Sequence, residues 1–266
     1  MSRPLIGNRN SWADFEKCVL EVFILALQML RNKSALPADE DSVQSRDSLN
    51  RRLDICLREA ILEWERINDT DILTTPKSNL GKQPDLDNEE IVNDYERTKP
   101  DFQWEFRDRL GNASSLNSIF RNYEIECKRL GLNSSSGRSF CKEYVSKGII
   151  RFITYTHCYG RFTSSGLMIG YIQDNDLQSI LDEVNNTAQS TALPELLLSP
   201  DSWKTDVSRL DHRLDRLDVG PTPFDLRHLW VDLRHHYQEK PTNLDKKVAV
   251  RKKRAPRKSK SSTTSK

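Results

Sequence analysis

The sequence lacks long hydrophobic runs. Its longest uninterrupted apolar stretch extends from Val22 to Leu27 and directly follows Glu21. This is far shorter than the ~20 apolar residues that a membrane-spanning helix needs. No basic segment or small-residue cleavage site of a secretory signal precedes it. We therefore expect a protein with no membrane partner and a cytoplasmic location.

Motifs of several enzyme classes are absent as well. The five cysteines form no Cys-x-x-Cys pair, the five histidines form no His-Glu-x-x-His, and there is no Gly-x-Ser-x-Gly. These absences argue against a zinc centre, a thiol-exchange centre and the serine nucleophile of α/β-hydrolases. An odd number of widely spaced cysteines is typical of reduced residues in a cytosolic protein.

Charge, in contrast, is abundant and unevenly distributed. Residues 246–266 contain ten Lys or Arg and no acid, whereas residues 1–245 contain 31 basic and 39 acidic residues, so their net charges are +10 and −8. The tail has almost nothing to bury, and we expect it to be disordered. A cationic arm binds polyanions, most commonly nucleic acid; a solubilising or localising tail is the alternative. Its candidate nucleic-acid contacts are Lys252, Lys253, Arg254, Arg257 and Lys258.

Apolar periodicity predicts the order of the structural elements. The expected helices are Ser11–Leu30, Leu49–Ile67, Phe140–Lys147 and Leu177–Val184. The expected strands are Asp101–Arg107, Tyr123–Arg129, Ile149–Tyr155 and Gly166–Gln173, and Phe224–Tyr237 is apolar enough to rejoin the core. This order predicts an α/β protein with a mixed β-sheet flanked by helices. Residues 1–70 would form an N-terminal helical region packed on the core. Residues 71–245 would form the core and a C-terminal extension, and residues 246–266 would form the tail.

The sharpest motif is a Pro-Asp pair followed by a Glu-x-Lys triplet. Pro100-Asp101 begins the first expected strand, and Glu126-Cys127-Lys128 lies on the second. Residues two apart on a strand share a face, so Glu126 and Lys128 point the same way, and a suitable register brings Asp101 to the same place. Two carboxylates, the Cys127 carbonyl and waters would form a Mg²⁺ site. The metal would polarise a phosphate and activate water, and the lysine would orient that water or offset developing charge.

In strand–turn–strand–helix order, this motif resembles the PD-(D/E)xK nuclease superfamily, over about residues 95–173. The resemblance implies a restriction-endonuclease-like core in which Asp101 and Glu126 bind Mg²⁺, or Mn²⁺ in its place, and Lys128 assists phosphodiester hydrolysis. It further implies an endonuclease acting on DNA, with RNA left open, as an effector of bacterial restriction or anti-phage defence. A protein partner or a homo-oligomer is expected, since the acidic body needs help to present DNA.

A further glutamate often supports the metal in this family. On a helix before the first strand, Glu59, Glu63 and Glu90 are candidates, and Glu124 lies beside Glu126 on the expected strand. The residues alone leave these open.

Several alternatives compete with the nuclease interpretation. An amphipathic sheet could simply pair Glu with Lys across its polar face, and a degenerate nuclease fold would not cleave. The other Pro-Asp pairs and the second acid-x-Lys triplet, Asp245-Lys246-Lys247, lie outside expected strands. Polar Gln103, Glu105 and Glu124 predict an edge position or an open, wet cleft for the site.

The Gly131–Ser139 segment has five residues between its glycines and an Arg before Ser, so it does not match a nucleotide-binding loop. Arg138 and the following helix start could bind a DNA or RNA phosphate, or the serines could simply cap the helix. A functional hypothesis of another class is a non-catalytic nucleic-acid-binding or scaffold subunit that holds nucleic acid with its tail and a partner with its acidic body.

Overall fold

The computed structural model describes residues 5–6, 11–33, 45–72, 74–78, 99–107, 119–131, 137–200, 202 and 206–237. The basic tail expected at 246–266 lies outside these ranges. Among the residues that are described, no helix is long and apolar enough to cross a membrane.

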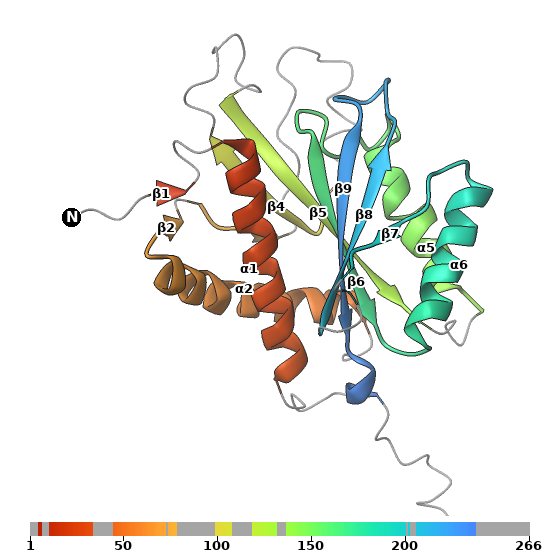
Figure 1. The fold of residues 1–266 in the computed structure, drawn as a ribbon, viewed down its shortest axis with the longest axis horizontal. Coiled ribbons are helices and arrows are strands. Elements are labelled where there is room, and N and C mark those ends of the chain that lie inside the picture. The colour runs from red at the N-terminus through yellow and green to blue at the C-terminus, as the bar shows by residue number, and fades with distance from the viewer. Residues whose placement is uncertain are drawn as a thin grey trace, which may run out of the picture.

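The protein has an α/β fold, with a seven-stranded mixed sheet flanked by helices (Figure 1). The strand order is β3-β4-β5-β6-β9-β8-β7, in which β5, β6 and β9 run parallel and the other neighbours pair antiparallel. The strands are β3 Lys77–Ser78, β4 Phe102–Arg107, β5 Phe120–Leu130, β6 Ser165–Ile172, β7 Leu197–Leu198, β8 Val207–Leu214 and β9 Phe224–Asp232. The helices are α1 Trp12–Asn32, α2 Arg46–Asn68, α5 Phe140–Ser146 and α6 Leu177–Ser190, with the 3-10 turns η1 Ile149–Phe152 and η2 Arg234–His236. A separate parallel pair joins β1 Leu5–Ile6 to β2 Asp71–Ile72.

Helices α1 and α2 cover one face of the sheet. Ser11 caps α1 through a reciprocal box with Asp14, which satisfies free N–H groups at the helix start. The apolar stripe of α1 packs with α2 against the odd-numbered side chains of β5, such as Tyr123 and Ile125, in one continuous core. The middle of this face of β4 and β5 is apolar, with Arg121 stacked on Trp12 and Phe106, so Glu124, Glu126 and Lys128 lie on the opposite face.

Helices α5 and α6 and the turn η1 cover that opposite face. Their core includes Tyr144, Phe152, Met168 and Trp230, all buried. Gly166 on β6 lets η1 lie directly on the sheet, because a Cβ there would come within 2.7 Å of Cε1 of Phe152. This close approach carries the neighbouring residues of η1 to the polar face of β5.

Most of the expected elements are confirmed, and one expected strand is wrong. The segment Ile149–Tyr155, expected as a strand, forms η1 and a series of turns instead. Its buried side chains Ile149 and Phe152 are three residues apart, which suits a 3-10 turn and not the two-residue period of a strand. Strand β8 was not expected, although its alternating VSRLDHRL pattern is typical of a half-buried strand.

Two histidines lie side by side in the α5 face of the sheet. The His212 and His228 ring centroids are 5.6 Å apart, and both residues are buried. Trp230 Nε1 donates to the Tyr144 hydroxyl at 2.9 Å, and that hydroxyl lies 2.8 Å from His228 Nδ1. The hydroxyl can therefore donate to Nδ1 only if His228 is neutral. Burial lowers the pKa of His212 to about 4, and burial next to His212 lowers the pKa of His228 well below its ordinary value.

The histidine pair predicts acid sensitivity. Both rings are neutral in the folded protein but titrate near ~6.5 in the unfolded chain, so between about pH 6.5 and 4 only the unfolded chain gains their protons. The free energy of unfolding should therefore fall as the pH falls through this window. For His212 alone the loss approaches roughly 3 kcal/mol. Urea unfolding between pH 7.5 and 4.5 measures it. His212→Gln should flatten the pH dependence and exposed His235→Gln should not; equal curves for both variants would contradict the assignment.

Candidate active site

The antiparallel register of β4 and β5 brings Asp101 and Glu126 together. Phe102 pairs with Ile125, so the residue before Phe102 lies across from the residue after Ile125. Asp101 Oδ2 accepts a hydrogen bond from the backbone N–H of Cys127 at 2.8 Å, which fixes its carboxylate beside the centre of β5. The two carboxylates occupy the same face of the sheet, as the sequence pattern predicts.

Lys128 joins the two carboxylates in this cluster. Its Nζ donates to Glu126 Oε1 and lies 3.3 Å from the Cys127 carbonyl oxygen. Asp101, Glu126 and Lys128 are only 6%, 0% and 6% exposed. The thiol of Cys127 belongs to the core on the α1 face, so this residue offers the site only its backbone carbonyl.

Two arginines that the sequence analysis did not single out complete the cluster. Arg46, the first residue of α2, has guanidinium nitrogens 3.9 Å from Asp101 Oδ1 and 3.9 Å from Glu126 Oε1. Arg151, on η1, has its NH1 3.2 Å from Glu126 Oε2 and 3.0 Å from the hydroxyl of Tyr159. Neither arginine lies near the motif in the sequence; only the folded chain brings them there.

The burial of Glu126 dominates its ionisation. Desolvation, followed by the neighbouring Asp101 carboxylate, raises the pKa of Glu126 to about 7, although Lys128 and Arg151 oppose the shift. The pocket thus disfavours a second negative charge unless cations surround it. Additional positive charge at this point would stabilise the ionised pair.

The site lies at neither a sheet edge nor an open cleft, and this expectation was wrong. Strand β5 is interior, between β4 and β6, and Gln103 and Glu124 are only 7% and 4% exposed. The segment from 148 to 163 covers this face: the backbone N–H of Gly160 donates to Glu124 Oε2 at 2.5 Å. Glu124 therefore holds the covering segment and is not itself among the groups that contact Glu126.

Arg216 fastens the covering segment from the other side. Only 3% exposed, it donates to the carbonyl oxygens of Phe152, Tyr159, Gly160 and Thr163 at 2.5 to 3.1 Å. These bonds fix the loop that carries Tyr159, whose hydroxyl contacts Arg151. Arg216 is thus a positioning residue that acts on the site through Tyr159 and Arg151.

We expect Arg216→Met to destabilise the fold strongly. The substitution leaves the carbonyl oxygens of Phe152, Tyr159 and Thr163 without their donor, whereas that of Gly160 keeps its bonds from Thr163. Each such loss costs about 1–3 kcal/mol, so the free energy of unfolding should fall by at least about 3 kcal/mol. Urea denaturation measures this, with Arg213→Met as the control, since Arg213 is exposed on the same strand side as Asp211. A loss below about 1 kcal/mol for Arg216→Met would contradict the role given to the clamp.

A cationic cavity of about 230 Å³ adjoins the carboxylates. It is bounded by the start of α2, the end of β5, helix α5 and η1. Six of its eight lining residues are basic and one is acidic; they are Arg46, Lys128, Arg129, Arg138, Phe140, Glu143, Lys147 and Arg151. Arg138, a candidate phosphate contact from the sequence, lies here and pairs with Glu143 at 2.5 Å.

The remaining sequence candidates lie elsewhere. Glu59 pairs with Lys33 at 2.9 Å, and it is thirteen residues after Arg46 on α2, or about 20 Å along the helix. Glu63 pairs with Arg66 on the exposed side of the same helix. Glu90 and the tail residues Lys252, Lys253, Arg254, Arg257 and Lys258 lie outside the described part of the chain.

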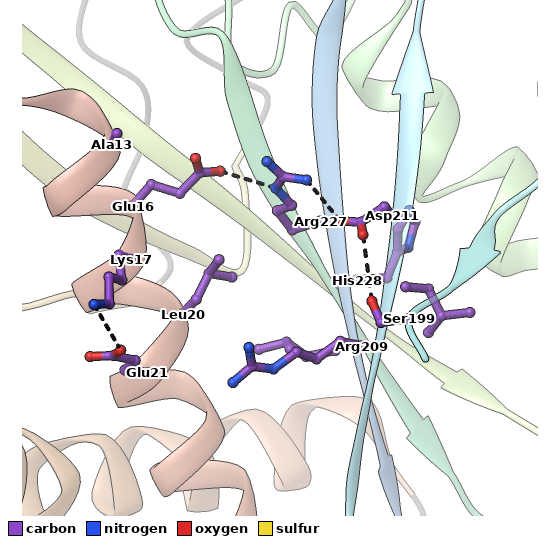
Figure 2. A pocket seen from close by; sticks show the side chains of 12 residues that line it. Ala13, Glu16, Lys17, Leu20, Glu21, Ser199, Arg209, Asp211, Arg227 and His228 are labelled. Atoms are coloured by element: carbon purple, nitrogen blue, oxygen red, sulfur yellow. Dashed lines mark hydrogen bonds and ion pairs between the residues drawn. The ribbon is translucent and has the colours of Figure 1, made fainter. Parts of the chain in front are cut away.

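A second hollow, between α1 and β8, has a different character (Figure 2). Its volume is about 330 Å³, and charges of both signs line it. Arg227 bridges Glu16 at 3.5 Å and Asp211 at 2.7 Å, and Lys17 lies 3.9 Å from Glu21. Because these charges neutralise one another, this hollow lacks the concentrated positive charge of the cavity beside Lys128.

The donor atoms at the carboxylate pair suit a hard divalent cation. Across the described ranges, no group of three or more His, Cys, Asp or Glu side chains is arranged to hold a metal ion. Asp101 and Glu126 form a pair instead, to which the Cys127 carbonyl adds a third oxygen. Such oxygens, completed by waters, are the ligands of Mg²⁺. The guanidinium of Arg46, 3.9 Å from an oxygen of each carboxylate, marks the point where both face a cation.

Compared with known proteins, the chain matches no protein-family model, no curated protein and no solved structure. What the site can do therefore follows from its own geometry.

Proposed function

We propose that the protein is a Mg²⁺-dependent nuclease that hydrolyses phosphodiester bonds of DNA. The observation that supports this most directly is the meeting of Asp101 and Glu126 with Lys128 at a buried point, where Lys128 also lines the neighbouring cationic cavity. Carboxylates alone would repel a phosphate, whereas a metal-binding pair next to a basic wall suits one. A role in bacterial restriction or anti-phage defence, in the cytoplasm, is the part of this proposal that depends on the sequence resemblance.

In this proposal the oxygens of Asp101, Glu126 and the Cys127 carbonyl hold the metal. When bound, Mg²⁺ supplies a Lewis acid and lowers the pKa of a coordinated water. Lys128, fixed beside Glu126, donates a hydrogen bond to the attacking water or to a phosphate oxygen. Arg151, which Tyr159 orients, faces the same point and stabilises the negative charge that develops on the phosphate.

The proposal predicts that cleavage depends on Glu126 and Lys128. Glu126→Gln removes one ligand charge and Lys128→Ala removes the amine, and each should lower the rate of DNA cleavage by about 10²-fold or more. The measurement is cleavage of plasmid, linear duplex and single-stranded DNA, and of RNA, by the purified protein with Mg²⁺ or Mn²⁺. Circular dichroism checks that both variants fold.

Two matched variants serve as controls. Glu105→Gln changes a carboxylate of β4 that pairs with Arg107, and Lys142→Ala changes an exposed lysine of α5. Both should cleave at the wild-type rate. Cleavage that persists in Glu126→Gln and Lys128→Ala would contradict the assigned site. Wild-type protein that neither cleaves nor binds Mn²⁺ in calorimetry would favour the non-catalytic scaffold.

A second prediction concerns Arg46, whose guanidinium lies where the two carboxylates face a cation. A divalent ion must share or displace it, so Arg46→Gln should tighten the binding of Mn²⁺. Two contacts at 3.9 Å from a partly exposed side chain contribute about 1 kcal/mol, or about a fivefold lower Kd. Isothermal titration calorimetry measures this without any turnover. Arg51→Gln on the same helix should leave the Kd unchanged, and unchanged or weaker binding in Arg46→Gln would refute the competition.

A further inference from the structure

The cationic cavity beside Lys128 extends beyond the carboxylates. Arg46, Lys128 and Arg151 belong to both places, whereas Arg138 and Lys147 line only the cavity. One phosphate at the carboxylates therefore does not occupy the whole basic wall. The far part of the cavity is a second place for an anion, directly next to the first.

The charge of this second place is strongly positive. Glu143 is the only acidic residue among the eight that line the cavity, and it already faces two cations, Arg138 at 2.5 Å and Lys147 at 2.8 Å. The positive field is also felt by Arg129: burial, followed by the charge of Arg138, lowers its pKa. An anion entering here would relieve repulsion among cations that the fold holds together.

The size of the cavity limits what that anion can be. Its volume of about 230 Å³ equals that of roughly eight water molecules. A phosphate with its attached sugar is of comparable size, and the exposed Arg138 and Lys147 side chains leave that end of the cavity accessible from solvent. The Arg129 guanidinium lies 4.2 Å from the ring centre of Phe140, so these two residues of the wall pack on one another.

We infer that this cavity binds the terminal phosphate of a nucleic-acid strand and places the adjacent phosphodiester bond at Asp101 and Glu126. A phosphate monoester carries close to two negative charges at neutral pH and three acceptor oxygens, which suits the part of the cavity lined by Arg129, Arg138 and Lys147 better than a singly charged diester. The inference rests on the proposed nuclease function and narrows it from internal cleavage to cleavage next to a phosphorylated end.

The test compares DNA oligonucleotides of one sequence that carry a 5′-phosphate, a 3′-phosphate or hydroxyl groups at both ends. Fluorescence anisotropy in EDTA measures binding without metal or turnover. Wild-type protein should bind one of the phosphorylated strands at least tenfold more tightly than the hydroxyl-ended strand. Arg138→Gln and Lys147→Gln, both at exposed positions that tolerate substitution, should each remove most of this preference. Lys142→Gln, on the same helix but facing α6, should retain it.

Cleavage assays with Mg²⁺ then separate the two claims. Digestion of the preferred phosphorylated strand with covalently closed circles left intact supports both. If the protein prefers a phosphorylated strand in binding but cleaves nothing, the result supports phosphate binding by the cavity and contradicts the proposed nuclease function. Equal binding of all three strands, or rapid cutting of closed circles, would overturn the inference about the strand end. Neither result would contradict the proposed nuclease function. Competition by a mononucleotide such as dAMP at the affinity of the whole strand would also overturn it, because the ligand would then be a free nucleotide.

Discussion

The arrangement of this protein depends on the burial of two carboxylates on an interior β-strand. Asp101 and Glu126 are almost fully enclosed, and neither an isolated ion nor a like-charged pair is stable in such a place. The surrounding groups stabilise the buried negative charge. They are the Cys127 N–H, Lys128 and the guanidinium groups of Arg46 and Arg151. The raised pKa of Glu126 shows that these groups do not fully offset the cost, and groups with strongly shifted pKa values cluster at functional sites.

The constraint extends outwards through the fold. Arg151 reaches Glu126 because η1 lies flat on the sheet, and η1 can do so because Gly166 leaves room for Phe152. The loop beyond η1 is held by Arg216 on one side and by Glu124 on the other. A polar residue on the sheet, a buried arginine and a glycine therefore serve one purpose: they bring a guanidinium from a separate segment onto a strand that the hydrophobic pattern alone would leave open.

The sequence predicted those parts of the site that follow from strand periodicity, and no more. Alternation along β4 and β5 places Glu126 and Lys128 on one face, and one register places Asp101 opposite. Arg46 and Arg151 could not be found in this way, because their positions depend on where α2 begins and on a turn whose apolar content resembles a strand. The polar face of β5 was expected to be wet for the same reason: a linear pattern shows that a face is polar but not that a loop 30 residues later covers it.

The net negative charge of residues 1–245 is a weak argument against phosphate binding once the positions of the individual charges are known. Residues 1–245 carry a net charge of −8, yet six of the eight residues that line the cavity are basic and one is acidic, and only the buried Asp101 and Glu126 lie behind Arg46, Lys128 and Arg151. At physiological ionic strength, charges more than about 8 Å away are largely screened, so a phosphate that enters the cavity interacts mainly with this wall. Acids on the outer surface of α2, such as Glu63, are too distant to oppose it. The net charge of a protein influences the approach of a long polyanion, whereas the charge of the cavity lining determines the electrostatic energy of one bound phosphate. Here the net charge of residues 1–245 is negative and the charge of the lining is positive.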